Sequence, residues 1–391
     1  MTNEVTQKTT SNEQNVSSSN GLEPLLRFCE FKGNLPQVKL SELFHKCTQK
    51  NRNGAINNVI CNSAKNGLIP QRDFFDKDIA NSENTTGYYI IKNNDFVYNP
   101  RKSNEAPYGP VSIYKDAEDG IVSPLYLCFR ATAPLCAEYF KMYFKSPAWH
   151  RYVYLMGDSG ARHDRVSIKD EVFFDMPVRT PSLSEQQKIA DFLSLVDARI
   201  EKQRLLVESL KKYKRGALSR IFNDVLETVK LSDISNFISS TRTLSTTLNS
   251  NKGIYPVYDA AGISGYIDHY DIDSDYITIV KDGSGVGRLQ KCDKKSSFIG
   301  TLGALVAKNC TTDFLYAVLQ TIDFSKFVTG MAIPHIYYKD YKNTLLPFPC
   351  EIKQHSISKF FKKIDEYIEN ETQKLSNILK YKQGLLQQMF I

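Results

Sequence analysis

The sequence predicts an α+β protein in which two similar globular bodies are separated by two long helices that form an antiparallel coiled coil. Three observations lead to this prediction. A long helical pattern in the middle of the chain recurs at its C-terminus, and a short segment that begins each body recurs as well. Between these repeats, strands and helices mix without regular βαβ alternation, which is typical of the α+β class.

The central helix has the clearest pattern in the chain and extends from Pro181 to Phe222. Ser184 followed by Gln187 has the spacing of a capping box, which marks a helix start. Its apolar stripe comprises Leu193, Val196, Ile200, Val207, Leu210, Ala217 and Ile221, with Gln203 and Lys214 as polar interruptions. A stripe of this period faces another helix for most of its length. Roughly 38 residues at 1.5 Å each extend about 57 Å, which indicates a spacer between two bodies.

A weaker copy of this helix extends from Ser356 to Phe390, and a shift of 168 positions overlays the two. The matches include residues outside the apolar stripe: Asp197 with Asp365, Tyr213 and Lys214 with Tyr381 and Lys382, and Gly216 with Gly384. Two unrelated amphipathic helices would share only the stripe, so these matches indicate a duplicated unit.

A second repeat lies near the start of each body. Val-Lys-Leu-Ser-Glu-Leu from Val38 reappears as Val-Lys-Leu-Ser-Asp-Ile from Val229, so the chain order is body, helix, body, helix. The terminal helix leaves the second body and therefore starts at the far end of the central helix. If the two stripes pair, the terminal helix runs back antiparallel. The duplication thus predicts a pseudo-two-fold symmetric arrangement.

This organisation divides the chain into five parts. They are a lead (1–21), a first body (22–180), the central helix (181–224), a second body (225–348) and the C-terminal helix (349–391). Because the lead is rich in Ser, Thr, Asn and Gln and has almost no apolar residues, we expect it to be disordered.

Composition narrows the class of protein. Lys and Arg total 50 against 43 Asp and Glu, a formal charge of +7, which permits a nucleic-acid partner without demanding one. The eight cysteines include no Cys-x-x-Cys pair, so we expect buried, reduced thiols in a cytoplasmic protein rather than a metal site. No signal peptide and no membrane span are expected, because no run reaches 18 uncharged apolar residues.

Catalytic signatures are missing from the sequence. None of the 20 glycines precedes a lysine, which excludes a P-loop, and no proline precedes Pro or Asp, which excludes the usual adenine methyltransferase and many nuclease motifs. The run of Gly283, Gly285 and Gly287 lacks a following helix and is interpreted as a turn between strands. His163 beside Ser159 is a local cluster, whereas triad members usually come from distant segments. No catalytic residue and no metal ligand is expected.

The start of the central helix resembles a known family. Pro-Ser-Leu-Ser-Glu-Gln-Gln-Lys-Ile-Ala-Asp-Phe-Leu, from Pro181, is similar to the central region of the specificity subunits of type I restriction–modification systems. Supporting matches begin at Leu26, Gly67, Ile121, Tyr255, Gly262 and Lys281, and the resemblance covers residues 22–391. The C-terminal copy departs from the pattern, because Glu351-Ile-Lys-Gln-His replaces the Glu-Gln-Gln run.

The resemblance implies a function for each part. Each body would be a target recognition domain that reads one half of an asymmetric, bipartite site in double-stranded DNA. The helices would set the spacer and dock two methylation subunits, which methylate adenine with S-adenosylmethionine. Restriction subunits would add cleavage driven by ATP and Mg²⁺. The specificity subunit itself would be a non-catalytic, cytoplasmic protein that binds no cofactor and no membrane.

For DNA contact we expect polar and basic residues in two loops of each body. In the first body these are Tyr98, Arg101, Lys102, Arg162, His163 and Arg165, and in the second Lys281, Ser284, Arg288, His335 and Tyr337. Arginine pairs bidentately with guanine, while lysine and serine commonly contact phosphates or bases. The alternative for each is a solvated surface side chain, and for Tyr98 and Tyr337 it is core packing.

Two other functions stay open from the residues alone. One is an enzyme in its own right, a fused methyltransferase or nuclease, which would methylate or cleave DNA without a partner. The other is an adaptor whose duplicated helices join other proteins without touching DNA. The adaptor would show no salt-sensitive affinity for any DNA.

Overall fold

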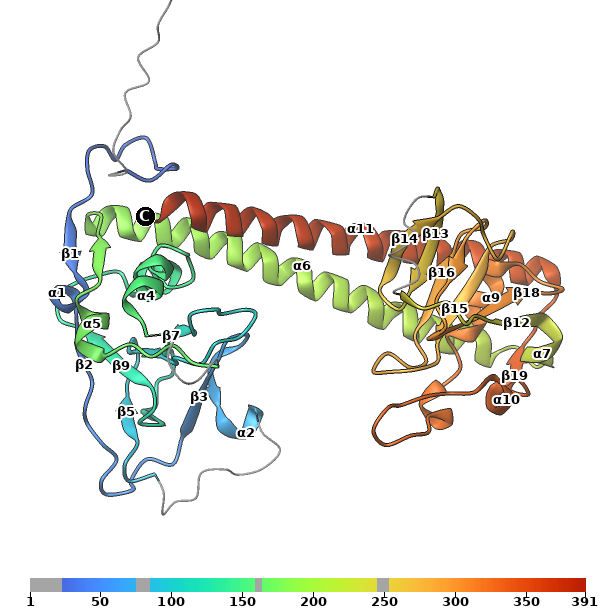
Figure 1. The fold of residues 1–391 in the computed structure, drawn as a ribbon, viewed down its shortest axis with the longest axis horizontal. Helices are drawn as coiled ribbons and strands as arrows, with labels where there is room; N and C mark the ends of the chain where they lie inside the picture. Colours follow the sequence, from blue (N-terminus) through green and yellow to red (C-terminus); the bar gives the residue numbers. More distant parts are fainter. Residues whose placement is uncertain (1–22, 75–84, 159–163, 245–252) are drawn as a thin grey trace, which may run out of the picture. The chain divides into compact units, whose positions relative to one another are not determined.

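The computed structural model describes residues 23–74, 85–158, 164–244 and 253–391 (Figure 1). Contacts within the chain define two compact units. Unit 1 consists of residues 1–200 and 376–391, and unit 2 of residues 201–375. Each unit therefore contains a globular body and a part of both long helices. The lead predicted at 1–21 lies outside the described residues.

The described residues of unit 1 form two four-stranded sheets and a two-stranded ladder. The first sheet has the order β2 (Phe44–Lys46), β9 (Leu127–Ala131), β6 (Phe96–Tyr98), β7 (Val111–Ile113), all antiparallel. The second has the order β4 (Gly67–Pro70), β3 (Val59–Ser63), β8 (Gly120–Val122), β5 (Tyr89–Ile91), with β3 and β8 parallel. The ladder joins β1 (Gln37–Lys39) to β10 (Pro177–Arg179). The short helices are α1 (Leu40–Leu43), α2 (Gln71–Phe74), α3 (Ala137–Tyr143), α4 (His150–Met156) and α5 (Asp170–Phe174).

The part of unit 2 that the structure describes forms a four-stranded sheet, a three-stranded sheet and a ladder. The first sheet has the order β12 (Ser235–Ser239), β18 (Leu302–Ala307), β15 (Tyr276–Val280), β16 (Leu289–Cys292), and the second β14 (Gly262–Ile267), β13 (Tyr255–Asp259), β17 (Ser297–Phe298). The ladder joins β11 (Thr228–Lys230) to β19 (Leu345–Pro347). The short helices are α7 (Leu231–Ile234), α9 (Thr312–Leu319), η2 (Phe324–Phe327) and α10 (Tyr338–Tyr341).

The two units share one topology. In the first sheet of each unit, the strand that comes first in the chain lies at an edge beside the last one, and in the second sheet of each unit one pair of strands is parallel. The repeated segments from Val38 and Val229 have the same local structure, because each enters a ladder strand and continues into a single helical turn. The α+β class and the duplication predicted from the sequence are both confirmed.

Each body packs its own core onto the long helices α6 (Leu183–Asn223) and α11 (Glu351–Met389). In unit 1, aromatic rings such as Phe44, Phe129 and Phe140 form one buried cluster with Leu193 of α6 and Met389 of α11. The corresponding cluster of unit 2 unites strands and α9 with helix residues, among them Leu218, Phe222 and Phe361. The apolar stripe predicted from the sequence therefore also contributes to the cores of the bodies.

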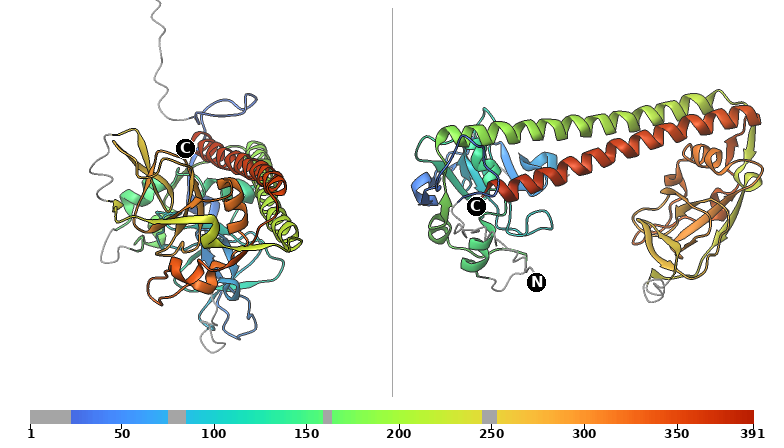
Figure 2. Two further views of the ribbon diagram at one scale, coloured as in Figure 1. Left: turned by 90° about the vertical axis from the view of Figure 1, so that its right-hand side faces the viewer. Right: turned by 90° about the horizontal axis from the view of Figure 1, so that it is seen from above.

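The two long helices lie side by side and run antiparallel within the units (Figures 1 and 2). In unit 2 the side-chain amide of Gln203 donates to the Glu371 carboxylate at 2.7 Å, and Lys214 binds Asp365. Residues with higher numbers in α6 pair with residues with lower numbers in α11, so the two helices run antiparallel. In unit 1 the same relation joins Asp197 to Lys382.

These polar pairs are related by the internal repeat. A shift of 168 positions takes Lys214 to Lys382 and Asp197 to Asp365, so the ion pair of unit 2 corresponds to the ion pair of unit 1. The same shift takes Gln203 to position 371, which is occupied by its own partner Glu371. Polar groups within an apolar helix contact disfavour every register that leaves them unpaired. The two interruptions of the stripe therefore specify the alignment of the helices.

Exchanging the charges of one ion pair tests this alignment. Lys214→Asp places two carboxylates together, and we expect it to lower the unfolding free energy by about 1–3 kcal/mol. Adding Asp365→Lys should restore most of the loss, because the pair is re-formed with reversed polarity. Urea denaturation of the full chain and its three variants measures the coupling. Additive effects of the two substitutions would contradict the assigned register.

The capping residue of α6 differs from the predicted one. The Ser182 hydroxyl accepts a hydrogen bond from the Glu185 N–H at 3.3 Å, so the cap lies two residues before the predicted Ser184. Helix α11 begins at Glu351, five residues before the start of the recognisable repeat. The Gln186 and Gln354 side chains anchor the two starts alike, each donating to the carbonyl oxygen of a proline five residues earlier.

An N-terminal segment, residues 26–28, contacts both α6 and α11 in unit 1. Arg27 makes two hydrogen bonds of 2.7 and 2.8 Å to the buried carboxylate of Glu185, and the Leu26 N–H donates to the Gln388 carbonyl of α11. The Phe28 ring packs edge-on against Phe192 at 5.8 Å. A buried carboxylate requires such a partner, so this segment completes the core rather than trailing from it.

The cysteines only partly follow the expectation. Cys47, Cys128, Cys136 and Cys292 are buried and free, but Cys29 and Cys350 are exposed. Burial raises the pKa of the Cys47 and Cys292 thiols to about 11, which keeps them protonated and unreactive at neutral pH. The expectation that all the thiols are buried is therefore wrong for these two positions.

Candidate nucleic-acid interface

The structure brings the two predicted loops of unit 1 together. The chain leaving β6 lies against the segment after residue 163, where the Lys102 N–H donates to the Asp164 carbonyl at 2.8 Å. The Val166 N–H donates to the Pro100 carbonyl, also at 2.8 Å, and Arg101 lies opposite Arg165 in an antiparallel bridge. Two arginines that are 64 positions apart in sequence therefore become neighbours.

The two arginines have different surroundings. Arg101 is exposed, with its Nε 4.0 Å from a carboxylate oxygen of Asp164. Arg165 is half-buried, and its Nε, within the part of the chain that the structure describes, is buried without a hydrogen-bond partner. A buried donor without a partner costs free energy unless a ligand satisfies it, so Arg165 is the stronger candidate for a direct contact.

Arg165 also lines a cavity of about 520 Å³ in unit 1. Lys46 and Tyr126 line the same cavity, together with Tyr89 from β5. Burial raises the pKa of Tyr126, so its hydroxyl stays protonated and can donate a hydrogen bond. The charge of Lys46 is partly neutralised by Asp170, because Lys46 Nζ lies 2.5 Å from Asp170 Oδ2. Sequence reasoning missed these residues, because they lie in or beside strands of three different segments and share no motif.

Tyr98 lies mostly in the core of unit 1, although it also lines the cavity beside Arg165. Its ring is buried and stacks on Phe173 with centroids 4.9 Å apart, and its hydroxyl donates to the Tyr108 carbonyl at 2.9 Å. Burial raises its pKa as well. This burial favours core packing, the alternative that the sequence also allowed, and the base contact of Tyr98 stays a prediction. Arg162 and His163 lie outside the described residues.

The predicted loops of unit 2 meet in the same way. The Gly283 N–H donates to the Pro334 carbonyl and the Ile336 N–H to the Lys281 carbonyl, both at 2.9 Å. His335 lies opposite Asp282 in an antiparallel bridge. The first loop follows β15 and the second precedes α10, just as the unit 1 loops follow β6 and precede α5. Equivalent strand ends thus carry the loops of both units.

The side chains of these loops differ in their exposure and in their pairing within the chain. Lys281 forms an ion pair of 2.6 Å with Asp282, whereas Ser284 and Arg288 are exposed, and Arg288 also donates to the Ala260 carbonyl. The His335 ring lies 4.9 Å from the Tyr337 ring.

Tyr337 is half exposed, so its core-packing alternative does not hold. The Lys339 ammonium lies 5.2 Å from the centroid of the Tyr337 ring. The exposed phenol and the adjacent cation are available to a ligand at this edge of unit 2.

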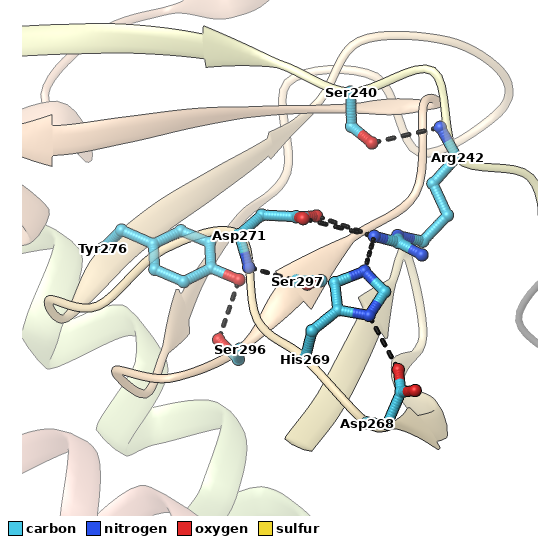
Figure 3. Close-up of polar contacts among 8 residues, drawn as sticks. All are labelled: Ser240, Arg242, Asp268, His269, Asp271, Tyr276, Ser296 and Ser297. Carbon is cyan, nitrogen blue, oxygen red and sulfur yellow. Dashed lines mark hydrogen bonds and ion pairs between the residues drawn. The ribbon is translucent and has the colours of Figure 1, made fainter. Parts of the chain in front are cut away.

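A second polar cluster of unit 2 has no counterpart among the predicted residues (Figure 3). The Arg242 guanidinium donates to Asp271 at 3.1 and 3.2 Å and lies 3.2 Å from His269, whose other ring nitrogen is 2.7 Å from Asp268. The hydrogen bond from His269 lowers the pKa of Asp268.

The cluster carries more carboxylates than fixed cations, so it does not favour an anion such as phosphate. The Arg242 backbone is also held, since its N–H donates to Ser240 and its carbonyl accepts from Gly300. We interpret the cluster as an anchor for the segment after β12.

Within residues 23–74, 85–158, 164–244 and 253–391, no group of three or more His, Cys, Asp or Glu side chains is arranged to hold a metal ion. Among the same residues, no helix is long and apolar enough to cross a membrane. The expectation that this chain binds no cofactor stays a prediction.

Comparison with known proteins gives two independent likenesses. The family model described as "Type I restriction modification DNA specificity domain" matches twice, at residues 37–208 and 223–380. The structure is similar to the crystal structure of the S subunit of a type I restriction–modification system from M. genitalium, with a TM-score of 0.58, 17% identity, and coverage of 94% of this chain and 99% of that one.

A second solved structure, published as "Structural basis underlying complex assembly and conformational transition of the type I R-M system", has a TM-score of 0.56 at 14% identity. It covers 91% of this chain and 98% of that one. A comparison with curated protein sequences finds no match. At these identities the structural likenesses concern the fold, while the family model identifies two copies of one domain.

Proposed function

Because the chain belongs to the family defined by the type I restriction modification DNA specificity domain, we propose that it is the DNA sequence-recognition subunit of a type I restriction–modification enzyme. Each unit reads one half of an asymmetric, bipartite site. The observation that carries this proposal is the convergence of the same two loops at the end of an equivalent strand in both units. Since the loops differ in sequence, the two half-sites differ as well.

The loop side chains suit two kinds of DNA contact, to bases and to phosphates. Arg165, whose Nε has no hydrogen-bond partner among the described residues, and Arg101 beside it suit bidentate contacts to guanine in unit 1. In unit 2 the exposed Arg288 has this role. Lys102 and Lys281 suit phosphates, which position the protein on the duplex without reading it.

The long helices serve the partners and the spacing. We propose that α6 and α11 set the number of base pairs between the half-sites and dock two methylation subunits. These partners transfer methyl groups from S-adenosylmethionine to adenine, and restriction subunits add ATP- and Mg²⁺-dependent cleavage. The chain itself contributes recognition and no chemical step. Because the proposed DNA ligand and partner subunits are found in the cytoplasm, we propose the same location for this chain.

Selection of DNA by the full chain tests the proposal. A duplex pool with a randomised segment is bound by the full chain, with and without the methylation subunit of the same source, and the bound fraction is sequenced. We expect two short specified stretches separated by unspecified base pairs, with an affinity that falls steeply as salt increases. No salt-sensitive affinity in either condition would contradict the proposal and favour the adaptor. Methylation by the chain alone would favour an enzyme.

A further inference from the structure

A short loop of unit 2, closed like a hairpin by one isolated antiparallel bridge and called the hairpin below, contacts the loop after β15. Thr329 and His335 form an antiparallel bridge with N–H···O distances of 2.9 and 2.8 Å, and the five residues between them form the tip. The base of the hairpin is tied to the loop after β15 by the Gly283–Pro334 and Ile336–Lys281 hydrogen bonds described above. The hairpin is thus held by main-chain bonds on both sides.

The turn of the hairpin depends on Gly330. Its φ of +88° lies in the region that favours glycine, and a Cβ there would lie 2.4 Å from the Ile333 carbonyl oxygen. The same carbonyl lies 3.2 Å from a ring nitrogen of His335. This geometry fixes the direction of the tip.

The tip carries apolar side chains that the protein does not cover. Met331 is fully exposed and Ile333 is 66% exposed, while Val328 at the base is 38% exposed. Exposed apolar side chains on a structured tip cost free energy in water, and a group of them marks a contact surface. The cations of this interface, Lys281 and Arg288, belong to the loop that the hairpin contacts.

DNA offers one apolar feature that suits such a tip. The C5-methyl group of thymine projects into the major groove, which is wide enough for a two-stranded β-ribbon, whereas the minor groove is about half as wide. We propose, on the basis of the proposed function, that the hairpin enters the major groove and that Met331 and Ile333 read thymine through its methyl group. Flanking cations contact phosphates or guanine, so the unit 2 half-site combines both kinds of contact.

Replacing thymine with uracil removes the methyl group alone. The probe is the duplex selected by the full chain from the randomised pool, with each thymine in turn replaced by deoxyuridine. In the half-site that Arg288→Ala alters, we expect at least one position where uracil weakens binding about 3- to 10-fold. Met331→Ala with Ile333→Ala should weaken binding of the thymine duplex by a similar factor and abolish the difference between thymine and uracil. The salt dependence should be unchanged, because no phosphate contact is lost.

Ile263→Ala is the matched control, since Ile263 is an exposed apolar side chain of β14 in the same unit. It should preserve both the affinity and the thymine preference. A double variant that retains the wild-type ratio of thymine to uracil affinity would overturn the proposal, as would a half-site insensitive to uracil at every position. The proposal would also be overturned if the double variant no longer bound the methylation subunit but still distinguished thymine from uracil. That result would assign the tip to a protein contact. If the wild-type chain binds no DNA, the proposed function itself fails.

Discussion

Val207→Asp combined with Leu210→Asp is expected to separate α6 from α11 in unit 2 and to abolish docking of the methylation subunits. Val207 is buried in the helix contact and Leu210 is half-buried beside it. A carboxylate placed there without a partner costs several kcal/mol, of order 3–5 for the pair. The damage should extend beyond the helices, because Leu218 and Phe222 of the same helix belong to the core of unit 2.

Leu205→Asp is the control on the same helix. Leu205 is exposed, so its substitution should change stability by less than about 0.5 kcal/mol. Thermal unfolding followed by circular dichroism measures stability, and co-purification of a tagged methylation subunit measures docking. Equal stability of the buried and exposed variants would contradict the helix pairing, and retention of the subunit by the buried variant would contradict its docking on the helices.

Arg101→Ala with Arg165→Ala is expected to remove recognition of one half-site while leaving the other. Each bidentate contact to a base contributes about 1–3 kcal/mol of discrimination, so the double variant should lose roughly 100-fold or more in affinity for its selected duplex. The two side chains lie opposite each other, and their effects should be coupled rather than additive.

The control for this prediction is Lys39→Ala in the same unit. Lys39 is exposed and pairs with Asp175 at the ladder, so it removes one cation outside the two loops. Selection from the randomised pool should then return both wild-type half-sites. If the double arginine variant also returns both half-sites unchanged, the loops of unit 1 do not read DNA.

The long helices and the duplication could be predicted because their signal is spread over many positions. The matches at Asp197, Tyr213 and Gly216 lie outside the apolar stripe, so they indicate descent from one unit rather than a shared amphipathic pattern. The pairing of Gln203 with Glu371 could not be predicted from composition, because it depends on the register of two helices. In the sequence alone these polar residues were only interruptions.

The positions of the loops could be predicted, but the pairing between the loops could not. Main-chain hydrogen bonds bring segments such as 100–102 and 164–166 together, and a sequence pattern does not contain such long-range pairing. The burial of Tyr98 could not be predicted from its residue type, because strand β6 is buried throughout while the hydroxyl of Tyr98 resembles that of a surface residue. Arg242 and its neighbours gave no signal, since their partners come from separate loops.

Lengthening both helices tests the central claim, that paired helices set the distance between two independent readers. Seven residues with the same apolar pattern are inserted after Gln203 in α6 and before Glu371 in α11, so the inserted segments lie opposite each other. The insertion adds about 10.5 Å, close to three base pairs of B-DNA at roughly 3.4 Å each. Selection of DNA by the lengthened chain should return the same two half-sites with a spacer about three base pairs longer. An unchanged spacer, or a changed half-site sequence, would contradict the account.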